Sequence, residues 1–582
     1  MRKLRFYSIM IVLSLFVIGI MNVRSNAMEN QRTKIHFISL YGNTDAILLE
    51  SNGHFGMVDS GEDWDYPTGE DEKYPFREGT VTTKGYEQQV IHYLKQVGVK
   101  KLDFYIATHA HSDHIGSGDE ILNHFPVDRL YIGRYDDSYQ LDAHGENAND
   151  LYYYPEAQEN RLWDNQYVYD RLIDAAKKTG VKIITDLDLD SNAIYRQFIM
   201  GKMKINIMNY ERERDENGNI IPVASENENS LVVKVSAYGK NALLTGDIDP
   251  TDGATKKVAD QLIEKLWETN GISDEQAEMI NNRRYTTEYT TEEVIDKKAI
   301  FIPSLNEIQK VDDESVPNQG KKIQLDLMKM AHHSIDYNNT TYFLTSLNPK
   351  VVVITGHENY FNERMQECLP DVAVYATATD SAAVIAEFSN EGISTRYQKI
   401  EPEWFDMDGI YYYCDDNGRM VTDWKYIEHE WYFFDKKGAM QTGWQKINNQ
   451  WYYLSDSGAM QTGWQKINNQ WYYLNDSGIM QTGWQKINNW WYYLNSSGAM
   501  QTGWQKINNQ WYYLNSSGAM QTGWQKIKSK WYYLNGSGVM QTGWQKIKSK
   551  WYYLNSSGVM QTGWQKIKSK KYYFNTSGVW VK

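Results

Sequence analysis

Two patterns of apolar and polar residues divide this chain. Between residues 28 and about 400, short apolar runs alternate with longer amphipathic segments. Runs such as KIHFISL (34–40) and SLVVKVSA (230–237) predict strands, whereas YEQQVIHYLKQVG (86–98) predicts a helix that ends at a glycine. The alternation of these elements indicates an α/β domain.

From about residue 401 a period of 20 residues replaces this pattern. A typical unit, GWQKINNQWYYLNDSGIMQT (463–482), combines the strand-like QWYYL with the turn sequence NDSG. Each unit is predicted to be a hairpin that needs its neighbours for stability, so the units should stack as a repeat array. A degenerate unit near Trp404 and the replacement of a tryptophan by Lys571 fit capping at the two ends. Tryptophan recurs at 424, 444, 464, 484, 504, 524, 544 and 564.

Composition narrows the possible functions. A chain of 582 residues is too long for one core, and two or more domains are expected. The net charge of −14 argues against a nucleic-acid partner, because phosphate binding depends on Lys and Arg. Two cysteines allow at most one disulfide and exclude a cysteine-rich zinc site.

The N-terminus has the order of a secretory signal. A basic MRKLR precedes the apolar residues 6–23, and small residues at Ser25 and Ala27 predict cleavage after Ala27. An uncleaved membrane anchor is the alternative, and no other segment is apolar enough to span a bilayer. We therefore expect a secreted protein with a signal peptide at 1–27, a catalytic domain at 28–400 with a polar surface insertion at 251–322, and repeats at 401–582.

The stretch THAHSDHIG (108–116) concentrates metal-ligating residue types at a strand end. His109 and His111, two residues apart, can face one ion, and after the chain turns Asp113 and His114 can reach a second. Imidazole and carboxylate suit zinc, with manganese or iron as alternatives. A solvated loop in which Asp113 caps the following helix is the competing interpretation.

Two later clusters extend this site. Asp247 follows the strand-like NALLTG and would bridge two ions, and His332 and His333 follow LDLMKMA. Because adjacent strand residues point in opposite directions, we expect one of these two histidines to be a ligand and the other a supporting partner.

In their order along the chain, HAHSDH, TGD, the later HH and MVDSG (57–61) resemble the metallo-β-lactamase superfamily. The resemblance implies an αββα sandwich with two metals at one edge between the sheets, and a structural role for Asp59 beside them. The sequence departs from the family at NENSLVV (227–233), where another histidine is often found. The first ion would then have fewer protein ligands or use Asn227 or Ser230.

A narrower similarity is to the teichoic-acid phosphorylcholine esterases, on KLDFYIATHAHSDHIG (101–116), RLWDN (161–165) and DLMKMAHH (326–333), with the repeats resembling their choline-binding tail. It implies hydrolysis of a phosphodiester by water activated between two Zn²⁺ ions, which releases phosphocholine from choline-bearing teichoic or lipoteichoic acid. Asp113 and Asp247 would be catalytic. The implied metal ligands are His109, His111, Asp113, His114, Asp247 and His333, with His332 as the less favoured member of its pair.

Recognition of choline requires aromatic or acidic surroundings. In the catalytic domain the candidates are Glu62, Asp63, Trp64, Asp65, Tyr66, Tyr74, Phe76 and Trp163. In the repeats, the two tryptophans of one unit and a tyrosine of the next would form a cage, with Met460 and its equivalents as an apolar wall. Many such cages on a polymer would bind by avidity. The expected cage tryptophans are Trp444, Trp451, Trp464, Trp471, Trp484, Trp491, Trp504, Trp511, Trp524, Trp531, Trp544 and Trp551.

Three alternatives stay open at this point. Similar repeats bind glucans in other proteins, since aromatic rings also stack on sugars. The same fold could act on another phosphodiester or a lactone. The chain could also be a non-catalytic adhesin whose metal domain is structural. The sequence assigns no oligomeric state.

Overall fold

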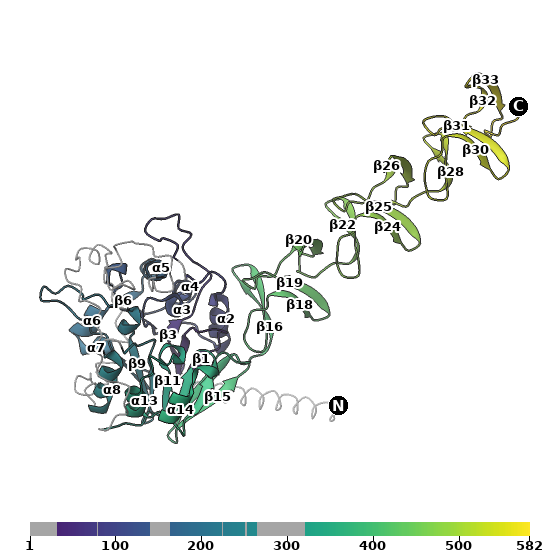
Figure 1. Ribbon diagram of the computed structural model, residues 1–582. Coiled ribbons are helices and arrows are strands. Elements are labelled where there is room, and N and C mark those ends of the chain that lie inside the picture. The colour runs from purple at the N-terminus through teal and green to yellow at the C-terminus, as the bar shows by residue number, and fades with distance from the viewer. Residues whose placement is uncertain (1–31, 78–79, 140–162, 224, 251–252, 265–320) are drawn as a thin grey trace, which may run out of the picture. The chain divides into compact units, whose positions relative to one another are not determined.

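The computed structural model describes residues 32–77, 80–139, 163–223, 225–250, 253–264 and 321–582. These residues divide into two compact units, with the division between Val421 and Thr422 (Figure 1). The predicted signal peptide and most of the predicted insertion lie outside the described residues. No helix among the described residues combines the length and the apolar character that crossing a membrane would require.

The first unit contains two mixed sheets. Among the described residues the first has eight strands, antiparallel from β15 to β3 and parallel from β3 to β6. Its order is β15 (Ile393–Gln398), β14 (Ala383–Phe388), β1 (Thr33–Ile38), β2 (Ala46–Ser51), β3 (His54–Ser60), β4 (Phe104–Ala107), β5 (Arg129–Ile132) and β6 (Lys182–Ile184).

The second sheet has seven strands within the same described part of the chain. Its strands are parallel from β13 to β10 and antiparallel from β10 to β7. The order is β13 (Ala373–Ala376), β12 (Val351–Ile354), β11 (Leu327–Lys329), β10 (Lys240–Leu244), β9 (Val232–Ala237), β8 (Met203–Met208) and β7 (Gln197–Met200).

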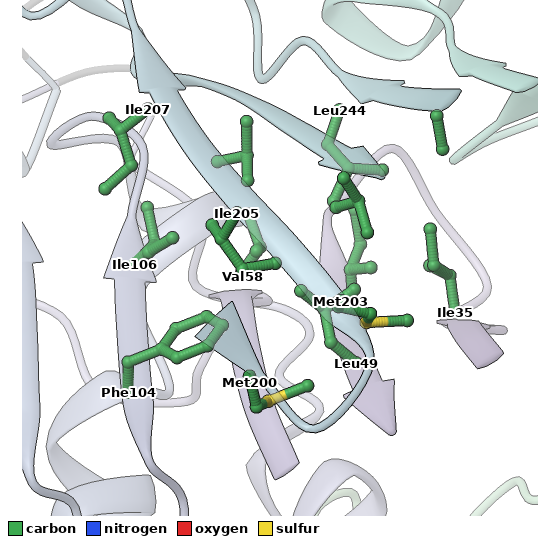
Figure 2. Packing of buried hydrophobic residues seen from close by; sticks show 14 of the residues in the cluster. Ile35, Leu49, Val58, Phe104, Ile106, Met200, Met203, Ile205, Ile207 and Leu244 are labelled. Carbon is green, nitrogen blue, oxygen red and sulfur yellow. The ribbon is translucent and has the colours of Figure 1, made fainter. Parts of the chain in front are cut away.

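The core between the sheets follows from the two-residue alternation of the strands. Ile35 in β1 packs inward against this core, whereas its neighbour His36 points outward to Tyr93 of α2 (Glu87–Val97). Figure 2 shows Phe104 and Ile106 of β4 packed against side chains of the second sheet. Each fully buried aliphatic or aromatic side chain of this kind contributes roughly 1.5–3 kcal/mol.

Helices cover both outer faces, which gives the expected four-layer αββα arrangement. Tyr93 of α2 lies on the outer face of the first sheet. A second apolar cluster joins three helices to the second sheet, namely α8 (Ala254–Glu264), α13 (Thr341–Leu347) and α14 (Glu363–Cys368). α8 belongs to the predicted surface insertion, yet its Val258 and Leu262 are buried in this cluster. The other α-helices of the described residues are α3 (Ser112–Ile115), α4 (Gly118–His124), α5 (Asn165–Thr179), α6 (Asp186–Ser191) and α7 (Ala193–Arg196).

The first repeat-like hairpin belongs to the first unit. It consists of β16 (Glu403–Met407) and β17 (Ile410–Cys414) and packs on α2. The Phe405 ring stacks on His92 at 3.9 Å between centroids, and Gln96 donates a hydrogen bond to Glu403 at 2.7 Å. The compact unit therefore ends at Val421, later than the boundary expected from the repeat period.

The second unit is a series of two-stranded hairpins with a nearly identical local structure. Asn448 and Asn449 both have positive φ (49° and 64°), as a two-residue hairpin turn that follows the strand twist requires. One backbone hydrogen bond joins successive hairpins; for example, the Met480 N–H donates to the Trp451 carbonyl at 2.8 Å.

Each hairpin of the second unit is formed by two strands that follow one another in the chain, so β18 pairs with β19 and β20 pairs with β21. They are β18 (Asp423–Ile427), β19 (Glu430–Phe434), β20 (Gly443–Ile447), β21 (Gln450–Leu454), β22 (Gly463–Ile467), β23 (Gln470–Leu474), β24 (Gly483–Ile487), β25 (Trp490–Leu494), β26 (Gly503–Ile507), β27 (Gln510–Leu514), β28 (Gly523–Ile527), β29 (Lys530–Leu534), β30 (Gly543–Ile547), β31 (Lys550–Leu554), β32 (Gly563–Ile567) and β33 (Lys570–Phe574).

Candidate metal centre and repeat sites

The carboxyl ends of strands from both sheets supply the residues of the candidate metal centre. β3 and β4 are parallel, as are β10 and β11, so the two strands of each pair end at the same edge of their sheet. After β4 the chain passes through His109 and His111 and enters the short helix α3, which carries Asp113 and His114. Asp247 follows β10, and the histidine pair follows β11.

Asp247 lies at the middle of this cluster. Its Oδ2 atom is 3.0 Å from His114 Nε2, 3.5 Å from His333 Nε2 and 3.7 Å from His332 Nε2. Asp113 Oδ2 lies 3.2 Å from His333 Nε2. Ligand atoms of Asp113, His114, Asp247 and His333 all lie within 4.8 Å of one another, which is close enough to surround one ion.

His332 and His333 do not alternate as residues of a strand would. β11 ends at Lys329, and the pair lies in a 3₁₀ turn, Ala331–Ser334, with φ of 48° and 52°. This left-handed backbone turns both imidazoles toward Asp247, so the expectation that strand geometry would separate them does not hold. His333 is buried, whereas His332 is partly exposed and contacts Asn338 at 3.0 Å through Nδ1.

A second set of nitrogen atoms adjoins the first. His109 Nε2 and His111 Nδ1 are 3.0 Å apart, and the His109 and His114 rings are 4.2 Å apart between centroids. Of the two residues considered as replacements for the missing histidine, Ser230 lies beside this set and Asn227 lies beside His332 of the first set. Ser230 Oγ is 3.2 Å from His109 Nδ1, and Asn227 Nδ2 is 3.5 Å from His332 Nδ1.

The donor atoms of the cluster fit metal ions. Several buried atoms have no hydrogen-bond partner among the described residues, although leaving such an atom unpaired costs about 1–3 kcal/mol. Coordination would satisfy them, and imidazole nitrogen with carboxylate oxygen is a normal ligand set for a transition-metal ion. The atoms are His111 Nε2, His114 Nε2, Asn227 Oδ1 and Asp247 Oδ2.

Electrostatics separate the two sets of histidines. Burial lowers the pKa of His111 to about 4 and that of His109 well below its ordinary value, so both imidazoles are neutral and ready to bind a cation. Burial also opposes charge on His114, but the carboxylates of Asp247 and Asp59 raise its pKa well above the ordinary range. The half of the site around Asp247 is therefore a region of negative potential that favours cations.

Asp59 supports His114 from behind. Its Oδ2 lies 2.8 Å from His114 Nδ1, and Oδ1 accepts the Thr108 backbone N–H at 2.8 Å. The His114 Nε2 atom is thereby directed toward Asp247, as in other sites where a carboxylate orients a ligating histidine. This arrangement agrees with the structural role that the family resemblance implied.

Two buried charges under the site were not anticipated from the sequence. The Lys329 ammonium lies 2.5 Å from Asp45 Oδ2 and 3.3 Å from Asp247 Oδ1, and its side chain is fully buried. Asp45 Oδ1 in turn lies 3.4 Å from His333 Nδ1. The only sequence signal was a lysine inside the apolar run LMKMA, a position where a charged residue needs a buried partner.

The candidate choline-recognition residues of the catalytic domain separate into two groups. Trp163 lies beside His111, with ring centroids 4.9 Å apart. Glu62 is buried nearby, and burial together with the neighbouring Asp113 raises its pKa well above the ordinary value.

The other acidic and aromatic candidates have different surroundings. Asp63 and Asp65 pair with Arg171, at 2.6 and 2.9 Å. Tyr74 donates a hydrogen bond to Asp170, and Trp64 is partly buried. Tyr66 and Phe76 are exposed. The structure thus brings only Trp163 and Glu62 next to the metal cluster.

In the repeats, three aromatic rings meet between consecutive hairpins. The Trp444 ring lies 6.4 Å from Trp451 at 86° and 4.9 Å from Tyr472 of the next hairpin. Trp451 remains 41% exposed, which leaves an open face for a ligand. The same geometry recurs at Trp464/Trp471/Tyr492, Trp484/Trp491/Tyr512, Trp504/Trp511/Tyr532, Trp524/Trp531/Tyr552 and Trp544/Trp551/Tyr572.

The repeated methionine has a packing role. A Cβ atom on Gly478 would lie 2.4 Å from the Met460 sulfur, so the methionine occupies the space beside the next turn. Gly478 also has φ of +76°, which disfavours other residues. The spacing of the aromatic sets is therefore fixed by packing between neighbouring hairpins.

Comparisons with known proteins agree with this division. Residues 41–269 match the metallo-β-lactamase superfamily, and 421–462, 461–502, 501–542 and 541–582 each match the choline-binding repeat. No curated protein matches the chain.

Similar solved structures include CbpJ, choline-binding protein F and an autolysin, all of Streptococcus pneumoniae. CbpJ, from strain TIGR4, is 32% identical, with a TM-score of 0.26, and the match covers 35% of this chain and 93% of CbpJ. Choline-binding protein F is 34% identical, with a TM-score of 0.29, over 37% of this chain and 78% of that one. The modular autolysin LytC is 25% identical, with a TM-score of 0.22, over 34% and 51%.

The buried His/Asp cluster, the two-sheet sandwich and the matched repeats give one consistent assignment. The chain combines a domain that matches the metallo-β-lactamase superfamily with choline-binding repeats, and these repeats indicate a surface protein associated with the cell wall.

Proposed function

We propose that this protein is a metal-dependent phosphodiesterase that releases phosphocholine from choline-decorated teichoic or lipoteichoic acid. The observation that carries the proposal is the position of Asp247 Oδ2, which lies within 3.7 Å of nitrogen atoms on His114, His332 and His333. A carboxylate so surrounded can hold two cations close together. Two bound Zn²⁺ ions would activate water and neutralise charge on the phosphoryl oxygens.

The chain's own residues have distinct roles in this proposal. Asp113, His114 and His333 hold one side of the site, and His109 and His111 the other, with Asp247 between them. Asp59 fixes the orientation of His114. The buried Lys329 binds Asp247 Oδ1, which leaves Oδ2 to face the histidines.

Choline recognition is assigned to the indole of Trp163. An indole face attracts a quaternary ammonium by roughly 0.5–2 kcal/mol. Trp163 is held in place because its carbonyl accepts a hydrogen bond from Arg77 at 3.1 Å. Its ring lies 4.9 Å from that of His111, which supports a choline position close to the metal cluster.

The test measures phosphocholine release from purified choline-decorated teichoic acid, with nitrophenyl-phosphocholine as a second substrate. We expect release that a chelator abolishes and added Zn²⁺ restores. A matched nitrophenyl phosphodiester without the ammonium group should react much more slowly, and Trp163→Ala should narrow that difference. Metal-loaded protein that releases no phosphocholine from either substrate would refute the proposal.

A further inference from the structure

The last three hairpins carry a charge that the rest of the chain does not share. Residues 523–582 contain eleven lysines and no arginine, aspartate or glutamate, which gives a formal side-chain charge of +11 in a chain of net charge −14. The preceding residues 423–522 contain seven lysines and six acidic residues and are close to neutral. This contrast arises within one repeat array of otherwise constant structure.

Most of the difference comes from the hairpin turns. Residues 447–450 read INNQ, whereas the equivalent residues 527–530, 547–550 and 567–570 read IKSK. Each of these turns adds two lysines. The turns at 527–530 and 547–550 keep the backbone of the array, since Lys528 and Ser529 retain positive φ (46° and 66°), as do their equivalents at 548 and 549. The added lysines are exposed and form no ion pair with any residue that the structure describes. They are Lys528, Lys530, Lys548, Lys550, Lys568 and Lys570.

The strand register places a further lysine on the aromatic face of each hairpin. Lys526 pairs with Trp531, and Trp524 pairs with Tyr533. Residues directly opposite one another lie on the same face of a hairpin, as do residues two apart. A cation bound between these rings therefore has an ammonium group nearby, where the negative group attached to that cation would lie.

The final hairpin has two lysines facing each other. Lys571 occupies the position of the second cage tryptophan and pairs directly with Lys566. Like charges directly opposite in a hairpin are destabilising, and residues 523–582 contain no acidic side chain that could offset them. An anion held between the two ammonium groups would remove this repulsion.

We propose that residues 523–582 form a polyanion-binding surface for the phosphodiester backbone of the polymer whose choline groups the aromatic cages bind. The backbone of a teichoic acid is a phosphodiester polymer, so a choline-bearing chain presents cations to the rings and anions to the lysines. The strand register favours this occupant, because Lys526 lies on the same hairpin face as Trp524 and Trp531. The inference concerns the repeats alone and stands whether or not the catalytic domain releases phosphocholine.

The experiment compares the full-length protein with a variant whose added lysines take the residues of the INNQ turns. Lys528, Lys548 and Lys568 become Asn, and Lys530, Lys550 and Lys570 become Gln, so each turn adopts a sequence that the same array already folds. The probe is choline-free poly(glycerol phosphate). We expect at least about tenfold weaker binding by the variant at about 50 mM salt, and steep weakening of wild-type binding toward about 200 mM.

Two controls make the result specific. Retention on a choline resin should be the same for both proteins, which shows that the variant array is folded and its cages intact. A second variant replaces six exposed lysines of the first unit and should bind the polymer like the wild type. These are Lys100, Lys101, Lys177, Lys178, Lys202 and Lys322.

Three outcomes would overturn the proposal. The turn variant could bind poly(glycerol phosphate) as tightly as the wild type. The first-unit variant could lose as much affinity for the polymer as the turn variant, which would mean that binding depends on the net charge of the protein and not on the position of the lysines. The wild type could bind vesicles containing anionic lipid but not the polymer, which would assign the lysines to a membrane surface.

Discussion

The metal centre and the aromatic cages are built by opposite means. Asp113 and His333 lie 220 positions apart in the sequence, yet their side chains approach to 3.2 Å in a buried site. Trp444 and Tyr472 belong to adjacent hairpins, and the same set of rings recurs along the array. The first site depends on the whole fold and exists once, whereas each cage depends on two hairpins and has copies. Substitutions should therefore abolish function in one region and reduce it by degrees in the other.

The largest effect is expected for Asp247→Asn, because Asp247 Oδ2 is shared by three histidines. Replacing residues that only orient metal ligands costs roughly 10–100-fold, so loss of this carboxylate should lower the rate by more than about 100-fold. Initial rates with nitrophenyl-phosphocholine and metal content per chain measure it. Asp174→Asn, at a 77% exposed side chain, is the matched control. Unchanged rate and metal content would contradict the assignment.

Removal of the buried ammonium should be the next largest change. Lys329→Met leaves Asp45 buried without its partner, which costs on the order of 3–5 kcal/mol in free energy of unfolding. The double variant Lys329→Met/Asp45→Asn should recover part of this loss. Lys350→Met is the control, because it breaks the ion pair between Asp326 and a lysine whose side chain is 52% exposed. This change should lower the free energy of unfolding by only about 0–1 kcal/mol. Equal losses in denaturant unfolding for the two lysines would refute the special role of Lys329.

The docked first hairpin should make the first unit sensitive to acid. Burial against Phe405 lowers the pKa of His92 to about 4, so the unfolded chain takes up a proton near pH 6.5 that the folded protein resists. The free energy of unfolding is therefore unaffected by His92 above about pH 6.5. It falls by at most about 3 kcal/mol as the pH decreases from 6.5 toward 4, because only the unfolded chain gains the proton in that range. His92→Gln should flatten the dependence between pH 7 and pH 5. The exposed His54→Gln should not, and a flat wild-type profile would exclude the effect.

The smallest effect is expected for one cage. Trp491→Ala removes a ring from one of six equivalent sets, at a cost of roughly 0.5–2 kcal/mol for that set, while the other five retain the protein on a choline resin. The neighbouring Trp490→Ala is the matched control, because that exposed ring lies outside the six sets. Calorimetry with free choline should show one fewer site only for Trp491→Ala. Complete loss of retention on the choline resin by Trp491→Ala would contradict the claim that the aromatic sets act as independent copies.

Much of the fold and the candidate site could be predicted from local signals. Strand alternation predicted the strands and Gly98 predicted the end of a helix, because both signals reflect backbone preferences that act within a few residues. The HAHSDH cluster was visible because its ligands share one strand end. The sequence did not reveal the pair of Asp45 and Lys329. An aspartate in a turn and a lysine in a strand are each common, and only the folded structure shows that these two are buried in contact.

Two other features also required the folded chain. Strand geometry predicted that His332 and His333 point apart, but a left-handed turn directs both toward Asp247. The repeat period placed the first hairpin with the array, but Phe405 and Glu403 attach it to α2. In both cases long-range packing changed what the local pattern implied.

The sequence by itself determined the repeat array, because each hairpin, turn and ring set is specified within about two units and packing repeats the same solution. It also determined which residue types are available for metal binding. Only the tertiary structure decided that they converge around one carboxylate oxygen with a buried ammonium behind it. Such convergence depends on where distant strands end, and the free energy that holds unlike charges together in a dry site exists only after the sheets have packed.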